Sequence, residues 1–159
     1  MNFMLEAKLM DFHLDGLLNL PDITIERCIK NDSKTILKVG FLTDYATCPH
    51  CQQSRDELHQ IRPILILDLP ISGQLIELEI PRRQYYCNNC QKYFTEQLCF
   101  VDVGRRYTKR YEEYIYHRVQ VTTVSQVKRE EELSWEQVQG IFNHQRKQVK
   151  KPHGERLNV

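Results

Sequence analysis

Two Cys-x-x-Cys pairs constrain the fold of this chain more than any other feature of its sequence. The first is Cys48-Pro-His-Cys51, and the second, Cys87-Asn-Asn-Cys90, follows after a spacer of 35 residues. Two residues between cysteines let one tight turn offer both sulfurs to the same ion, and Zn²⁺ takes four such ligands at about 2.3 Å in a tetrahedron. The pattern therefore predicts a structural Zn²⁺ site. Four thiolates leave no position open for water or substrate.

A redox pair and disulfides are the other interpretations of these cysteines. Redox chemistry normally needs a thioredoxin-like βαβ context, which the surrounding sequence lacks. Disulfides are rare in reducing compartments, and residues 1–20 carry four interrupting charges and no cationic start, unlike a signal peptide. No apolar run approaches the roughly 20 residues that cross a bilayer. We therefore expect a cytoplasmic protein with no membrane partner.

Three further residues are weaker candidates for metal ligands. Cys28 lies in a predicted strand and is interpreted as a small buried or outward-facing thiol. Cys99 lies in the strand-like run "EQLCFVDV" and is interpreted as a core residue. His50 is interpreted as a solvent-facing turn residue, because four cysteines already complete the zinc shell.

Hydrophobic periodicity predicts β-structure before about residue 103 and helices after it. Residues 3–20 have mixed helical spacing and end at Pro21, which predicts a short N-terminal helix. Two β-hairpins are expected next, over residues 22–42 and 63–87, and "QLIELEI" in the second alternates wet and dry positions. The second hairpin returns the chain toward the first Cys pair, so the two pairs can meet.

Three helices are expected to close the chain, over residues 108–120, 123–133 and 134–151. A break near Leu133, then a Ser that can cap the next helix and Glu/Gln soon after it, give the last two helices the pattern of a helix-turn-helix. At 100° per residue, one face of the third helix is predicted to be core and carries Trp135, Val138, Ile141, Phe142 and Gln145.

The opposite face of the third helix is polar, rich in amides and small at Gly140. Such a face suits a DNA major groove, where Asn and Gln read adenine edges and Lys or Arg meets guanine or phosphate. An ordinary solvated helix face is the alternative interpretation. The acidic run Glu130–Glu132 argues against DNA binding unless it faces away from the phosphates.

Charge is unevenly distributed along the chain. Residues 1–103 carry 10 Lys+Arg and 14 Asp+Glu, whereas residues 104–159 carry 12 and 7. A basic C-terminal end with cations on both sides of the helices is typical of a nucleic-acid partner. The predicted DNA-contacting residues of this end are Arg105, Arg106, Lys109, Arg110, Ser134, Glu136, Gln137, Gly140, Asn143, His144, Arg146, Lys147, Lys150 and Lys151.

In their order, the motifs resemble the N-terminal part of bacterial insertion-sequence transposases of the ISL3 group. The blocks that carry the likeness are "LLNLPDITIERC", "CPHC", "LDLPISGQLIELEIPRRQYYCNNCQKYFTEQL" and "TTVSQVKREEELSWEQV". The resemblance implies a zinc finger followed by a helix-turn-helix. It matches Cys48, Cys51, Cys87 and Cys90 to the zinc ligands and residues 134–147 to the DNA-reading helix. Arg82 and Arg83 match a basic pair before the third cysteine and are also predicted to contact DNA. Phe94, Thr95 and Glu96 match a signature after the fourth cysteine.

The resemblance also implies a function and its limits. In the family, an RNase-H-like domain with an Asp-Asp-Glu triad would begin where this chain stops at Val159. Two-metal phosphodiester chemistry needs convergent carboxylates, so we expect no enzymatic activity from the chain alone. The expected partner is double-stranded DNA at transposon terminal inverted repeats, in the bacterial cytoplasm and nucleoid. A transposase-derived regulator that binds operator DNA and a protein partner, as a homodimer, and a nuclease remain alternatives.

The predicted fold class is α+β, with a small β-rich zinc-binding domain of two hairpins followed by a three-helix helix-turn-helix domain. The expected bounds are residues 1–20 for the N-terminal helix, 21–103 for the zinc domain, 104–150 for the helix-turn-helix and 151–159 for a tail. Residues 102–108 are expected to link the two halves.

Overall fold

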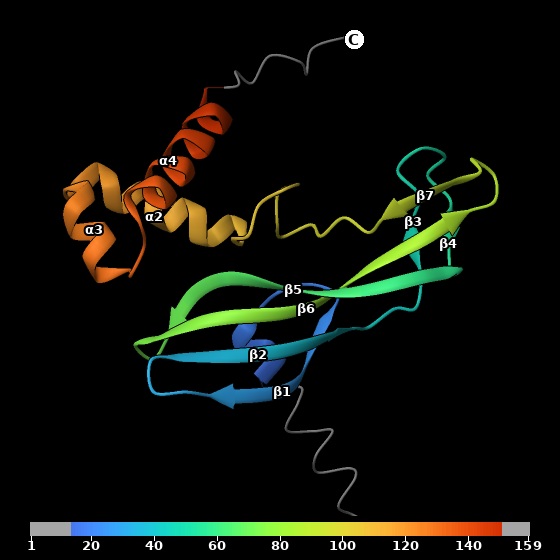
Figure 1. The fold of residues 1–159 in the computed structure, drawn as a ribbon, viewed down its shortest axis with the longest axis horizontal. Coiled ribbons are helices and arrows are strands. Elements are labelled where there is room, and N and C mark those ends of the chain that lie inside the picture. Colours follow the sequence, from blue (N-terminus) through green and yellow to red (C-terminus); the bar gives the residue numbers. More distant parts are fainter. Residues whose placement is uncertain (1–13, 151–159) are drawn as a thin grey trace, which may run out of the picture. The chain divides into compact units, whose positions relative to one another are not determined.

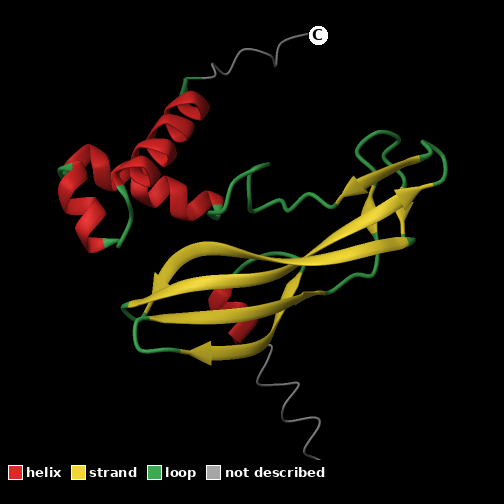
Figure 2. Cartoon of the chain, in the orientation of Figure 1, coloured by secondary structure: helices red, strands yellow, loops and turns green. Residues whose placement is uncertain are grey.

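The computed structural model describes residues 14–150, which divide after Thr108 into two compact units. The first unit is built mainly from strands and the second from helices (Figures 1 and 2). This mixed α and β content agrees with the predicted fold class.

The described residues of the first unit form seven strands. They are β1 (Ile23–Lys30), β2 (Lys34–Phe41), β3 (Ala46–Thr47), β4 (Ser54–Arg55), β5 (Leu58–Ile71), β6 (Gln74–Cys87) and β7 (Lys92–Thr95). Five of them make one sheet in the order β1-β2-β6-β5, with β7 paired to β6, and β3 and β4 form a separate ribbon. Both expected hairpins, β1–β2 and β5–β6, are present. A parallel pairing of β2 with β6, which the sequence did not indicate, joins them into one sheet.

A two-residue turn closes the long β5–β6 hairpin. Ser72 and Gly73 both have positive φ, 51° and 76°, as a type I′ turn requires. Glycine adopts this conformation without steric cost, and the turn's twist matches that of the flanking strands. The alternation that follows is the predicted one, since Ile76, Leu78 and Ile80 are buried while the odd-numbered residues between them are half-buried.

The first hydrophobic core lies on the Ile76–Leu78–Ile80 face of the sheet. Its buried members are Leu18, Ile23, Ile25, Leu37, Val39, Ile66, Ile76, Leu78, Ile80 and Phe100. Leu18 comes from a helical turn at residues 14–18, where Asp15 also accepts a hydrogen bond from the backbone N–H of Ile25 at 2.7 Å. The rest of the predicted N-terminal helix, residues 3–13, lies outside the described part of the chain.

A second, smaller core uses the opposite face of the same hairpin. Beyond Ile80 the buried positions of β6 change from even to odd numbers, because Arg83, Tyr85 and Cys87 are buried. Alternate side chains of a strand point to opposite faces, so β6 contributes to one core with each face. The second core contains Ala46, Cys48, Tyr85, Cys87 and Phe94, with Cys51 and Cys90 packed against it.

The segment that leaves the second core is bonded to the first unit as far as Thr108. The backbone N–H of Leu67 donates to Arg106 O, and the N–H of Thr108 donates to Leu67 O, both at 3.0 Å. The Thr108 hydroxyl donates to the buried Asp68 carboxylate at 2.6 Å. The end of the segment expected as a linker is therefore held along β5.

The second unit contains the helices α2 (Lys109–Val121), α3 (Val124–Glu130) and α4 (Trp135–Val149), which pack against one another. Their buried side chains include Tyr111, Ile115, Val127, Leu133, Val138 and Ile141. Ser134 caps α4 as predicted, because its hydroxyl accepts from Gln137 N–H at 3.1 Å while the Gln137 side chain accepts from Ser134 N–H at 2.8 Å. Among residues 14–150, no helix is long and apolar enough to cross a membrane.

The turn between α3 and α4 contains a residue in the left-handed conformation. Glu132 has φ of 54°, and the next N–H, of Leu133, donates back to Lys128 O at 3.1 Å, as in a Schellman motif. A residue with a Cβ is disfavoured there by about 1–2 kcal/mol. This position usually belongs to glycine or asparagine.

Glu132→Gly is therefore expected to raise the free energy of unfolding by up to about 1 kcal/mol, since relief of the backbone conformation exceeds the entropic cost of glycine. The measurement is urea unfolding of the full chain, followed by helical circular dichroism. Glu113→Gly is the matched control, because Glu113 is exposed within α2. There, glycine should destabilise by about 1 kcal/mol. Equal changes in the free energy of unfolding at both positions would show that the left-handed conformation of Glu132 is not destabilising.

Candidate metal centre and nucleic-acid interface

Two tight turns bring the four predicted cysteines together. Cys48 and Cys51 lie between β3 and β4, while Cys87 ends β6 and Cys90 precedes β7. All four Sγ atoms lie within 4.8 Å of one another. Sγ of Cys48 is 4.0 Å from that of Cys90, and Sγ of Cys51 is 3.6 Å from that of Cys87.

These distances test whether the cluster fits zinc. Sulfurs bound at about 2.3 Å around a regular tetrahedron lie about 3.8 Å apart, a spacing between the two measured values. A disulfide would need about 2.05 Å. Both the donor set and its spacing therefore fit a tetrahedral zinc ion bound by four thiolates.

The backbone turns back in the same way after each cysteine pair. Gln52 and Gln91, each directly after the second cysteine of its pair, have positive φ of 58° and 52°. In the first turn, Gln52 N–H donates to Cys48 O, and Cys48 N–H donates to Gln53 O, both at 2.9 Å. Each turn is thus closed by one left-handed residue, so that the chain can re-enter a strand at once.

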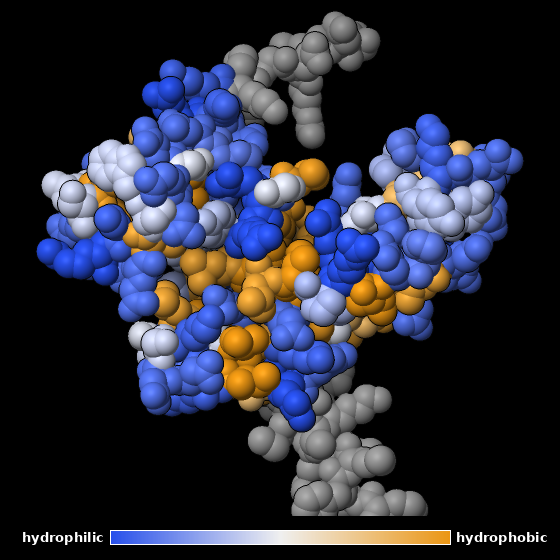
Figure 3. Space-filling model, viewed as in Figure 1, coloured by the Kyte–Doolittle hydropathy of each residue, from blue (hydrophilic) through white to orange (hydrophobic). Residues whose placement is uncertain are grey.

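An aromatic wall supports the cysteine cluster. Tyr85 and Phe94, opposite each other in β6 and β7, are buried and stacked with ring centroids 5.9 Å apart. Hydrophilic residues cover most of this end of the β-rich unit on the face seen in Figure 3. The interior here is small, and a core of this size usually needs a metal to remain folded.

Arg55 contributes positive charge to the cluster. Its Nε donates to Cys87 Sγ at 3.2 Å, and one terminal nitrogen lies 4.0 Å from Cys51 Sγ. Burial raises the pKa of Cys87, but the hydrogen bonds from Arg55, from the Cys90 backbone and from the neighbouring thiols together lower it, to about 6. Burial and the neighbouring thiols raise the pKa of Cys90 to about 12. Cys87 and Cys90 therefore do not ionise together unless a cation lies beside them, and zinc supplies that cation. Arg55 was not among the predicted site residues, and the available signal was its position four residues after Cys51.

The outward face of α4 is polar and open. Its exposed side chains are Glu136, Gln137, Gln139, Asn143, Arg146 and Lys147. A Cβ added to Gly140 would have nothing within 4 Å. The packing of the helices therefore does not require glycine at this position.

The acidic run before α4 is largely neutralised within the helical unit. Glu131 is buried and accepts hydrogen bonds from the Tyr114 hydroxyl at 2.7 Å and from Arg118 at 3.0 Å. Arg118 also pairs with Glu130. The objection that this run raises to DNA binding therefore applies mainly to Glu132.

Comparisons with known proteins identify both units. Residues 44–90 match the zinc-finger of transposase IS204/IS1001/IS1096/IS1165, and residues 96–145 match the helix-turn-helix domain of transposase family ISL3. The chain carries the N-terminal region of an ISL3-type transposase. No curated protein and no solved structure matches this chain. In this ISL3-type region the four cysteines form the structural Zn²⁺ site of the zinc ribbon.

Arg83 of the ISL3-type region is buried, so the prediction that it contacts DNA is wrong. The residue is 6% exposed, and its guanidinium forms two hydrogen bonds of 2.7 Å with the Glu96 carboxylate and lies 4.0 Å from the centroid of the Phe41 ring. It also donates to the Thr43 carbonyl. The guanidinium is buried and each of its three nitrogens donates inside the fold, so it does not present a surface to DNA. Arg82, its neighbour, is exposed.

Several other predicted contacts of the ISL3-type region have structural partners. The side chains of Ser134 and Gln137 are used in the capping box of α4. His144 is half-buried, with Nε2 3.6 Å from the buried Glu112 carboxylate. Arg106, Lys109, Arg146, Lys147 and Lys150 are exposed, whereas Arg105 and Arg110 are half-buried. Lys151 lies outside the described residues.

Trp135 corrects the predicted core face of α4. Val138, Ile141 and Gln145 are buried, but Trp135 is 47% exposed. Trp135 is the first residue of the helix, and its indole N–H donates along the helix surface to the Gln139 side chain at 3.0 Å. The indole therefore covers the first turn of α4 and does not enter the core.

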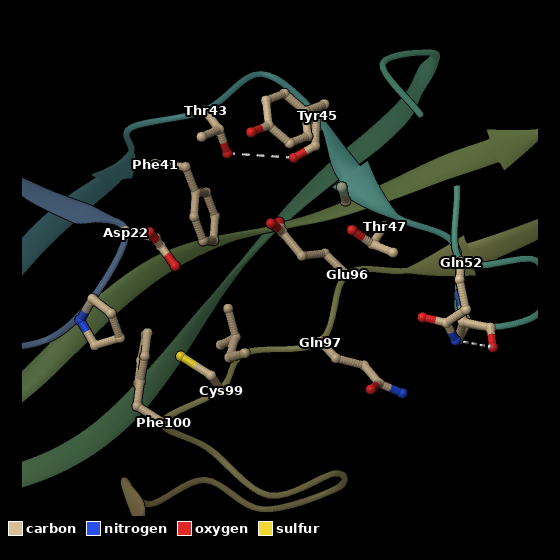
Figure 4. Close-up of a pocket in the computed structure, with 14 residues that line it drawn as sticks. Asp22, Phe41, Thr43, Tyr45, Thr47, Gln52, Glu96, Gln97, Cys99 and Phe100 are labelled. Carbon is tan, nitrogen blue, oxygen red and sulfur yellow. Dashed lines mark hydrogen bonds between the residues drawn. The ribbon is translucent and has the colours of Figure 1, made fainter. Parts of the chain in front are cut away.

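Cys99 is also not the core residue that was predicted. The run around it forms no strand, because Val101 N–H donates to Leu98 O in a turn. The turn directs Phe100 into the first core and leaves Cys99 exposed on the wall of a groove of about 510 Å³ (Figure 4). Glu96 also lines this groove, but its carboxylate is bound to Arg83. Cys28 and His50 are exposed, in agreement with their predictions.

Proposed function

We propose that this region recognises the terminal inverted repeats of a transposon, with α3 and α4 as the two helices of the helix-turn-helix and α4 in the DNA major groove. The observation that carries the proposal is the exposed polar face of α4, which begins at a capped N-terminus within a segment that matches a helix-turn-helix domain. In this motif, the N-terminal residues of the second helix reach the base edges.

Residue chemistry supports different roles along that face. Asn143 is exposed and carries the amide that pairs with adenine in the major groove. Lys147 lies four residues later, near the basic end of the helix, where it would meet a phosphate. Gly140 costs an α-helix about 0.5–1 kcal/mol relative to alanine, and nothing within the fold occupies the space. A close approach of DNA to the backbone accounts for this glycine.

We propose in addition that zinc serves this region as a structural support and takes no part in DNA cleavage. Four thiolates saturate a tetrahedral ion and leave no position for an activated water. Of the three acids before α4, Glu130 and Glu131 are engaged with Arg118. Cleavage by the transposase would then require residues other than those of the zinc ribbon and the helix-turn-helix.

The proposal is tested by binding to a duplex that carries the terminal repeat of the element encoding this chain. Affinity should fall steeply with salt concentration. Lys147→Ala should weaken binding to all duplexes and reduce the salt slope by about 0.9, while Asn143→Ala should reduce the preference for the terminal repeat. Lys30→Ala, an exposed lysine on β1, is the control and should change little. An affinity for the terminal-repeat duplex that changes neither with salt concentration nor with these substitutions would refute the proposal.

Gly140→Ala separates a binding role from a folding role in the same experiment. Alanine should stabilise α4 by about 0.5–1 kcal/mol, because its Cβ meets no neighbour. The same methyl group should weaken binding to the terminal-repeat duplex if DNA approaches the backbone here. A variant that is more stable and binds equally well would remove Gly140 from the interface.

A further inference from the structure

The zinc end of the hairpin has an exposed face that contributes to neither core. Since Arg83, Tyr85 and Cys87 point into the second core, the alternate residues Arg82, Gln84 and Tyr86 point to the other side of β6. Strands β5 and β7 flank β6 at this end (Figure 1). Three layers of side chains follow one another on this face, and together they are called the zinc-end strip. The layers are His59 with Tyr86 and Tyr93, then Gln60 with Gln84, then Arg62 with Arg82.

Aromatic rings form the first layer of the strip. The Tyr86 and Tyr93 rings lie 5.0 Å apart, and the His59 ring lies 4.4 Å from Tyr93. His59 is the extra residue where the β5–β6 register shifts between Leu58 and Gln60, and such a bulge redirects a side chain. Tyr93 is 54% exposed. An aromatic platform is thus open to solvent, beside the zinc site but not in its core.

Amide and guanidinium groups form the next two layers. Gln60 donates to Gln84 at 2.8 Å across the strands, which shows that both side chains are on this face. Two residues further along, Arg62 lies directly opposite Arg82, and both are exposed. Like charges opposite each other destabilise a sheet, and within residues 14–150 neither arginine forms an ion pair. An anion bound between them would relieve this repulsion.

We propose that the zinc-end strip binds a short single-stranded segment of nucleic acid. Unpaired bases stack on Tyr93 and its neighbouring rings, and the backbone phosphates meet Arg62 and Arg82. From Tyr86 to Arg82 the strand extends about 13 Å, and aromatic rings combined with cations are the usual means of binding single strands. Bases within a duplex are already stacked on each other and cannot cover these rings. The strip is therefore a second nucleic-acid site, distinct in residues and ligand from the face of α4.

The test measures binding of fluorescein-labelled (dT)12 to the zinc-loaded full chain by fluorescence anisotropy. Tyr93→Ala should weaken binding by about tenfold or more, and Tyr93→Phe should retain it, because stacking needs the ring and not the hydroxyl. Arg82→Gln should weaken binding and reduce the salt slope by about 0.7. Tyr45→Ala is the matched control, since Tyr45 is 52% exposed and lies outside the strip.

Three outcomes would overturn the proposal. The first is no binding of (dT)12 even at a salt concentration 100-fold below the highest at which the duplex still binds. The second is an equal effect of Tyr93→Ala and Tyr45→Ala on (dT)12 binding. The third is loss of (dT)12 binding in Lys147→Ala. The last result would assign the oligonucleotide to α4. Retained (dT)12 binding in Lys147→Ala, with duplex binding weakened, supports two sites. Zinc content is measured for each variant. If Tyr93→Ala loses zinc, the (dT)12 affinity of Arg82→Gln is used instead, because Arg82 is remote from the zinc ligands.

Discussion

Replacing Cys87 with serine should abolish stoichiometric zinc binding and unfold the zinc end of the β-rich unit. Cys87 is buried, lies 3.6 Å from Cys51 Sγ and belongs to the second core. Structural zinc contributes about 10–16 kcal/mol of apparent binding free energy in zinc-finger peptides, which is comparable with the whole stability of a small domain. The change is measured as zinc per chain and as loss of amide-exchange protection in β6 and β7.

The helices provide an internal control for this result. Helices α2 to α4 have their own buried residues, so their exchange protection should persist when zinc is removed by a chelator. Cys99→Ser is the matched substitution, because Cys99 is exposed and is not part of the cysteine cluster. Full zinc content in Cys87→Ser, or loss of zinc in Cys99→Ser, would show that the ligand set is different.

Arg83→Ala should destabilise the β-rich unit by about 3–5 kcal/mol, the usual cost of removing one partner from a buried ion pair. The substitution leaves the Glu96 carboxylate without its two hydrogen bonds and removes the guanidinium from the Phe41 ring. Arg83→Lys should rescue little, because an ammonium cannot form the bidentate pair or stack on the ring. Denaturant unfolding, followed by a probe in the β-rich unit, gives the change.

Two variants make this prediction specific. Arg82→Ala, at the neighbouring exposed position, should change stability by less than about 0.5 kcal/mol. The double variant Arg83→Met with Glu96→Leu should recover much of the loss, because it removes both charges together. If Arg83→Ala and Arg82→Ala cost the same, the ion pair does not stabilise the fold.

The contrast between Arg82 and Arg83 shows what the sequence could and could not predict. The resemblance assigned both arginines to one basic pair, but one is a surface residue and the other a core residue. A signal was present, because alternate residues share a face and Cys87 must point to the metal. Counting back from Cys87 in steps of two gives Tyr85 and Arg83 as inward positions. Hydrophobic periodicity missed this, because the polar Arg83 occupies a core position that only a specific partner, Glu96, makes tolerable.

Local patterns predicted the elements, and contacts between distant segments were harder to predict. Cysteine spacing predicted the zinc site, hydrophobic alternation predicted the β5–β6 hairpin, and Ser134 predicted the start of α4. The parallel pairing of β2 with β6 depends on two segments about 40 residues apart. Side-chain partners such as Arg55 for Cys87 leave no periodic trace in the sequence either.

The unbroken course of β6 from the Ser72–Gly73 turn to Cys87 gives the metal a role in strand registration. A slip of one residue in a hairpin exchanges the two faces of a strand, and here it would turn Cys87 outward and Arg82 inward. A slipped hairpin then has at most three thiolates near one point and binds zinc poorly. Zinc thus stabilises the correctly paired hairpin, and the same strand extends the effect about 36 Å further, to Ile76 in the first core. During folding, metal capture at one end of β6 would act as a check on strand alignment at the other.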